Sequence, residues 1–135
     1  MKLIEKIENT IEYDKLINQQ LENLSQFDNL TEYEILELTI HHKSSEAGIL
    51  IEYLGHEKLK NHLPIFLAFT QDGNWPAAGG AAKMLVKARE IIIPEIKKVF
   101  KVFWNDEIWH YWILILIIGN WDKELVENLK PELIE

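Results

Sequence analysis

The sequence contains no cysteine, no long apolar segment and few basic residues. Without cysteine, disulfide bridges and thiolate metal sites are excluded. The longest nearly pure apolar run, at residues 111–119, is about half the length of a membrane-spanning helix. The N-terminal residues carry acidic side chains throughout and lack the apolar region of a signal peptide. We therefore expect a soluble, cytoplasmic protein with no membrane partner.

The charge balance is strongly acidic. Fourteen lysine and arginine residues stand against 22 aspartate and glutamate residues, which gives a net charge of −8 with neutral histidines. The basic residues are scattered, apart from a short cluster at Lys97, Lys98 and Lys101. Nucleic-acid-binding proteins gain much of their affinity by neutralising phosphates, so we expect no nucleic-acid partner. An acidic surface favours a basic protein partner, or serves only solubility.

Helical patterns extend along the chain. With 135 residues, of which 47% are hydrophobic and 27% charged, the chain has the size and composition of one globular domain. No segment alternates for long like a strand. Thr31 and Glu34 form a capping-box pattern, Gly55 is a natural helix terminator, and Pro64 and Pro94 suit first turns. The sequence predicts an all-α fold of about seven to eight short helices.

Short motifs recur about 30 to 34 residues apart. Asp72 and Trp75 frame a D-x-x-W pattern that returns as Asp106 and Trp109. Two helices per period are typical of α-solenoids, because one helix pair cannot bury its apolar face alone. The repeats therefore predict a HEAT-like α-solenoid of stacked antiparallel helix pairs.

The expected organisation is a single HEAT-like helical domain over residues 1–135. Within it, residues 1–60 are expected to form N-terminal helices or a cap. Residues 61–135 are expected to form the repeat region, because the recurring motifs lie there.

The stretch QDGNWPAAGGAA contains three of the six glycines. A phosphate-binding loop needs a preceding strand and a Lys-Ser/Thr pair, and this stretch has neither. Pro76 instead indicates a helix start, where Asp72 or Asn74 caps the first turn. Gly79 and Gly80 cost about 1 kcal/mol each relative to alanine inside a helix. We therefore expect a neighbouring helix to approach closely at both glycines.

The second half of the chain resembles a bacterial helical family of unknown function. A Gln-Asp-x-Asn-Trp-Pro turn marks that family and stands here as Gln71, Asp72, Asn74, Trp75 and Pro76. An acidic pair before a Trp-x-Tyr-Trp helix follows it and stands here as Asp106, Glu107, Trp109, Tyr111 and Trp112. The similarity covers residues 63 to about 130. The resemblance implies a HEAT-like helical fold and brings no established activity.

The five tryptophans allow two interpretations. The segment WHYWILILII is apolar nearly all round, which is typical of a central buried helix. Alternatively, tryptophans near the inter-helix turns serve as aromatic anchors inside an acidic rim. The interaction candidates are Asp72, Asn74, Trp75, Trp104, Asp106, Glu107 and Trp109.

No pattern indicates catalysis or metal binding. A zinc site needs three or four converging ligands, whereas His42 and Glu46 are separated by serines that interrupt the helix. Asp106 and Glu107 have the chemistry for acid–base work, but as first-turn residues they more simply cap a helix. We expect surface histidines, no metal, no cofactor and no enzymatic activity.

Three functions fit these observations. The first is a non-enzymatic protein–protein interaction module with an acidic, aromatic-bearing solenoid surface, for example an immunity protein that neutralises a basic toxin. The second is a small-ligand-binding protein with a tryptophan-lined pocket. The third is a HEAT-like DNA glycosylase-type enzyme that uses Asp106, Trp104 and Trp109. The third needs a basic concave face, which the acidic composition disfavours.

Overall fold

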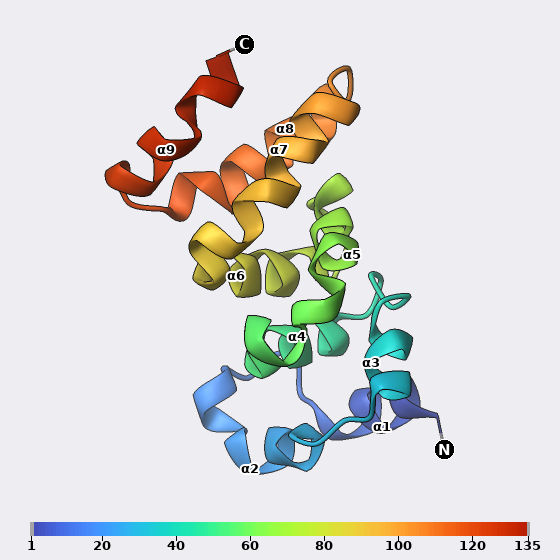
Figure 1. The fold of residues 1–135 in the computed structure, drawn as a ribbon. Helices are drawn as coiled ribbons and strands as arrows, with labels where there is room; N and C mark the ends of the chain where they lie inside the picture. The colour runs from blue at the N-terminus through green and yellow to red at the C-terminus, as the bar shows by residue number, and fades with distance from the viewer. Residues whose placement is uncertain (1, 135) are drawn as a thin grey trace.

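A computed structural model describes the backbone of residues 2–134 and the side chains of residues 2–127 and 129. This part of the chain is helical and contains no strand, which confirms the all-α prediction. Figure 1 shows the α-helices. They are α1 (Leu3–Thr10), α2 (Leu21–Leu24), α3 (Glu32–Leu38), α4 (Ser45–Lys58), α5 (Leu63–Ala68), α6 (Ala78–Ala88), α7 (Ile93–Val102), α8 (Glu107–Leu116) and α9 (Lys123–Ile134). Short 3₁₀ turns between them are η1 (Ile17–Gln19), η2 (Ser25–Phe27), η3 (Lys60–His62), η4 (Phe69–Gln71), η5 (Arg89–Ile92) and η6 (Ile118–Asn120).

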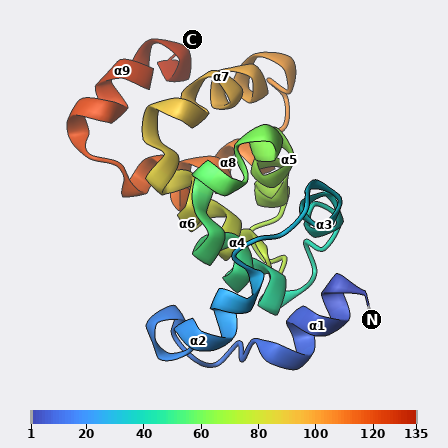
Figure 2. The ribbon, with the colours of Figure 1, turned by 60° about the horizontal axis from the view of Figure 1, so that its bottom comes forward.

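From α4 onward the helices pack in two rows. In one row α6 contacts both α4 and α8, and in the other α7 contacts both α5 and α9. Contacts of α5 with α6, and of α7 with α8, join the two rows. Figures 1 and 2 both place α9 beside α7, at the end of the molecule far from α1 and α2. The first row therefore ends at α8 within the described residues.

Apolar residues at helical spacing form one core that extends from α1 to α9. Each helix contributes its inward face, and the large side chains there have almost no solvent exposure. Among the most deeply buried are Ile7, Leu50, Phe66, Leu85 and Ile96. The core is thus a single cluster that includes residues from both rows of helices.

Several helix ends agree with the local sequence signals. The Thr31 hydroxyl accepts a hydrogen bond from the Glu34 N–H (3.1 Å), and the Glu34 carboxylate accepts one from the Thr31 N–H (3.0 Å), which confirms the capping box. Pro64 and Pro94 both stand in first turns. The backbone leaves helical geometry at Gly55, where φ is 80°, so that α4 is kinked there.

Two glycines allow the close crossing of α4 and α6. A Cβ atom on Gly80 would overlap with the backbone carbonyl of Gly48, and one on Gly48 would lie 2.9 Å from the Cα of Ala77. This confirms the expected close approach at Gly80. The expectation was wrong for Gly79, because a Cβ there would meet no atom within 4 Å. The difference arises because the two residues lie on different faces of α6, and only one face meets α4.

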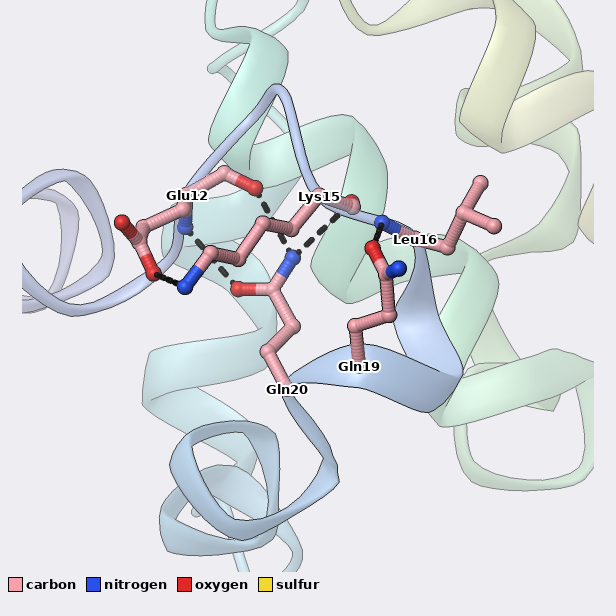
Figure 3. Close-up of polar contacts among 5 residues, drawn as sticks. All are labelled: Glu12, Lys15, Leu16, Gln19 and Gln20. Carbon is pink, nitrogen blue, oxygen red and sulfur yellow. Dashed lines mark hydrogen bonds and ion pairs between the residues drawn. The ribbon is translucent and has the colours of Figure 1, made fainter.

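A buried glutamine holds the irregular segment between α1 and α2 (Figure 3). The Gln20 side chain is 5% exposed. Its oxygen accepts a hydrogen bond from the Glu12 N–H (2.9 Å), and its amide donates to the carbonyls of Glu12 (2.8 Å) and Lys15 (3.1 Å). Next to it, the exposed Gln19 accepts a single hydrogen bond from the Leu16 N–H. Gln20 thus replaces the backbone partners that a helix or strand would supply.

Replacing Gln20 with leucine is expected to lower the free energy of unfolding by about 2 to 3 kcal/mol. The apolar side chain keeps the volume but removes all three hydrogen bonds, so that the part-buried Glu12 N–H and Lys15 carbonyl lose their side-chain partner. Urea unfolding of the variant and the parent measures the loss. Gln19→Ala is the control and should change stability by less than about 1 kcal/mol, because its hydrogen bond is exposed. Equal losses in the two variants would contradict the role given to Gln20.

Candidate functional site

The turn between η4 and α6 is closed by its own aspartate. The Asp72 carboxylate accepts a hydrogen bond from the Asn74 N–H (2.9 Å), and the Trp75 N–H donates to the Asp72 carbonyl (3.0 Å). The helix begins later than expected, at Ala78, and no side chain caps it. The prediction that Asp72 or Asn74 caps α6 was therefore wrong. The Asp72 carboxylate is already bound to the Asn74 N–H inside the turn. Residues 76 and 77, which were expected to begin the helix, also belong to the turn.

Trp75 is half-buried and packs against the segment before α4. Its ring lies 4.3 Å from the His42 ring, centroid to centroid, and the His42 carbonyl accepts a hydrogen bond from the Ala77 N–H (2.9 Å). The His42 ring also meets the edge of Phe69. The expectation of a solvated histidine was wrong at this position, since His42 is half-buried. Trp75 thus has a structural partner on one face of its ring.

The turn at residues 71–76 and the motif at residues 106–112 contact each other in the structure, through residues other than those expected. A Cβ atom on Gly73 would overlap with the ring of Trp112, so the glycine lets α8 lie directly against the turn. A second link is the hydrogen bond from the Trp109 indole N–H to the Thr70 hydroxyl (3.0 Å). Asp72 and the start of α8 therefore belong to one region of the molecule. Trp112 was not among the candidate residues, and its contact with a glycine carries no sequence signature.

Trp109 is a core residue. It is 5% exposed, and its hydrogen bond to Thr70 is buried. Including it among the surface anchors was therefore wrong, because a partner protein cannot reach its ring. Helical spacing explains the error: Trp109 lies in the first turn of α8 on the buried face that it shares with Ile113. There its ring lies beside Phe103 and its indole N–H reaches Thr70. Asp106, in contrast, caps α8 by accepting from the Trp109 N–H (3.0 Å).

One face of α8 is open to solvent, although its composition is typical of a central buried helix. Ile108 is 67% exposed, Tyr111 and Ile115 are exposed, and Trp112 is half-buried. These four residues are spaced i, i+3, i+4 and i+7, so they form one stripe along the helix. We call Ile108, Tyr111, Trp112 and Ile115 the α8 stripe. The interpretation of α8 as a central buried helix was wrong because the row of helices ends there and leaves one side uncovered.

The turn between α7 and α8 adds further exposed apolar side chains. Trp104 is 72% exposed, which agrees with its selection as a surface candidate. With the exposed residues of α8 it belongs to a group that we call the α7–α8 apolar surface: Val102, Phe103, Trp104, Ile108, Tyr111, Leu114 and Ile115. Hydrophobic periodicity could have placed Ile108 and Ile115 together, but it could not show which side of α8 is covered.

The charged side chains of α8 and of the turn before it have one sign. The sequence from residue 102 to residue 122 contains no lysine or arginine. Asp106 and the exposed Glu107 stand at the N-terminal end of α8, and Asp72 lies on the turn that meets Trp112. Lys101, in the last turn of α7, is the nearest basic residue in the sequence. The arrangement presents an apolar stripe with carboxylates at one end.

The described residues also contain open pockets but no metal site. A pocket of about 410 Å³ lies between α4, α6 and α8 and is lined by Glu52, Lys83 and Lys87 together with apolar side chains. Trp109 lines a smaller pocket of about 260 Å³. No group of three or more histidine, aspartate or glutamate residues in this part of the chain is placed to hold a metal ion. No described helix has both the length and the apolar character needed to cross a membrane.

Family comparison gives one match. Comparisons with curated proteins and with solved structures found none. A family model described as "Domain of unknown function (DUF5071)" matches residues 38–135. The match begins at the end of α3, well before residue 63, so it includes α4 as well as the two motifs. Because it covers more than half of the chain, the protein belongs to this family of unknown function.

Proposed function

We propose that the chain is a non-enzymatic protein-binding module with a HEAT-like solenoid arrangement, and that the α7–α8 apolar surface is its contact site. The observation that carries this proposal is the gathering of seven large exposed apolar side chains between residues 102 and 115. Contiguous apolar patches are rare on monomeric proteins and mark interaction sites when polar groups border them. Asp106 and the exposed Glu107 directly precede Ile108 in the sequence.

The two rows of helices support the solenoid part of the proposal. In a solenoid each helix pair packs only against its neighbours, as α6 does between α4 and α8, and α7 between α5 and α9. Such proteins need a polar outer face on their terminal repeats to stay soluble. The α8 stripe is apolar, so the end of this row suits a partner better than it suits solvent.

Charge supports a basic partner. The chain carries a net charge of −8, and the sequence from residue 102 to residue 122, which contains the contact site, has no lysine or arginine. A basic protein would be attracted over a distance and would be held at the rim by Asp106 and Glu107. An immunity protein that covers a basic toxin is a specific form of this proposal, motivated by the same charge and by the absence of a catalytic pattern in the sequence. Neither nucleic acid nor membrane is proposed as a partner.

Affinity purification of the tagged protein from its native host at low salt tests the function. We expect one stoichiometric basic protein, lost above about 0.5 M salt, where exposed charges are screened. Ile108→Asp should abolish its recovery. Ile40→Asp is the matched control, because Ile40 is also 67% exposed but lies outside the contact site, and it should leave recovery unchanged. Recovery of only a small molecule or nucleic acid, or equal recovery with both variants, would contradict the proposal.

A further inference from the structure

The α8 stripe has the geometry of a helix-binding face. Its members recur at i, i+3, i+4 and i+7, which is the spacing by which one helix packs along another. The stripe is uncharged, and the sequence from Ile108 to Trp121 contains no Asp, Glu, Lys or Arg. It therefore accepts an apolar helix face without burying an unpaired charge.

The position of α8 in the fold strengthens this point. α6 covers one side of α8, while α9, which follows it in the chain, packs against α7 instead. The next place in the row of α4, α6 and α8 is thus not filled by any element between residues 2 and 134. A helix in that place would repeat the packing that α6 and α8 already show.

The acidic residues near the α8 stripe favour a helix of another protein over a second copy of this chain. They also favour one direction of that helix. Carboxylates lie at the N-terminal end of α8, at Asp106 and Glu107, and Asp72 lies on the turn that meets Trp112. A second copy would bring further acid, since each chain carries a charge of −8. A helix antiparallel to α8 places its last turn beside these carboxylates. Basic residues in a last turn are also favoured by the helix dipole.

Resting on the proposed function, we infer that the partner contributes an amphipathic helix, which lies antiparallel along the α8 stripe with basic residues in its last turn. Its apolar face covers Ile108, Tyr111 and Ile115, and its basic end faces Glu107. Glu107 is exposed and heads α8, so it is free to turn toward the incoming charge. The class of ligand is a basic amphipathic helix of another protein.

Two synthetic peptides of about 20 residues test the inference, a length that supports a helix. Both carry leucines at 3- and 4-residue spacing on one face, with alanine and glutamine elsewhere. One carries lysines in the last turn, and the other carries them in the first turn. Fluorescence anisotropy of the labelled peptides gives Kd with the intact chain. We expect the last-turn peptide to bind about fivefold more tightly at low salt, and the difference to vanish near 0.5 M salt.

Variants of the protein test which residues contact the peptides and which end of the peptide lies beside Glu107. Ile108→Asp should weaken both peptides more than about tenfold, while Ile40→Asp should leave both unchanged. Glu107→Lys should abolish or reverse the preference for the last-turn peptide without altering the circular dichroism of the protein. Equal binding of the two peptides, or no binding of either, overturns the inference. A concentration-dependent dimer that Ile108→Asp dissociates overturns it too, because a second copy then occupies the stripe.

The outcomes separate this inference from the function on which it rests. If neither peptide binds but recovery of a basic protein still depends on Ile108, the surface binds protein by another element. In that case the helix inference fails and the proposed function stands. If recovery is also independent of Ile108, both fail.

Discussion

Replacing Gly80 with alanine is expected to lower the free energy of unfolding by about 3 kcal/mol. The added methyl group would overlap with the backbone carbonyl of Gly48, and a backbone atom cannot move aside as the end of a side chain can. α4 and α6 must then separate, although their contact is the most extensive between helices in the described chain. Overpacking of this kind costs about 1 to 3 kcal/mol, and a clash with backbone belongs at the upper end. Denaturant unfolding measures the loss.

The adjacent Gly79 supplies a matched control. The substitution is the same, the helix is the same, and a methyl group at Gly79 meets no atom within 4 Å. Gly79→Ala should therefore leave stability unchanged or raise it by up to about 1 kcal/mol, since alanine favours the helix. If both alanines destabilise the fold equally, the contact of Gly80 with Gly48 does not explain the loss, and the account of the crossing is wrong.

Replacing Trp109 with alanine is expected to cost about 3 to 5 kcal/mol. The side chain is buried at the start of α8, so its removal leaves a large cavity. The Thr70 hydroxyl also loses the indole N–H that it accepts at 3.0 Å. Equilibrium unfolding in urea gives the loss of stability, and circular dichroism before unfolding shows whether the helices are retained.

Trp104→Ala is the comparison that separates a core tryptophan from a contact tryptophan. Trp104 is exposed at the α7–α8 turn, so its removal should change stability by no more than about 0.5 kcal/mol. It should nevertheless reduce recovery of the basic partner, because the side chain belongs to the α7–α8 apolar surface. A loss of stability from Trp104→Ala similar to that from Trp109→Ala would show that Trp104 is packed in the core and is not a contact residue.

Local signals predicted several helix starts, missed the start of α6, and predicted the site only in part. The capping box at Thr31 and the prolines at Pro64 and Pro94 act through neighbours in sequence, so their effects can be read directly from the chain. The site depends on which side of α8 is covered. Trp104 and Trp109 are both tryptophans near one turn, yet the first is exposed and the second is buried. Hydrophobicity alone does not distinguish them.

The sequence by itself determined the helical class, several helix starts, the acidic charge and the absence of cysteine chemistry. These properties follow from composition, from short-range periodicity and from backbone preferences. Only the tertiary structure decided that Gly80 packs against Gly48 while Gly79 does not, that Gly73 receives the ring of Trp112, and that one face of α8 stays uncovered. The physical reason is that each depends on contacts between segments far apart in the chain, where packing selects one side of a helix and leaves the other to solvent.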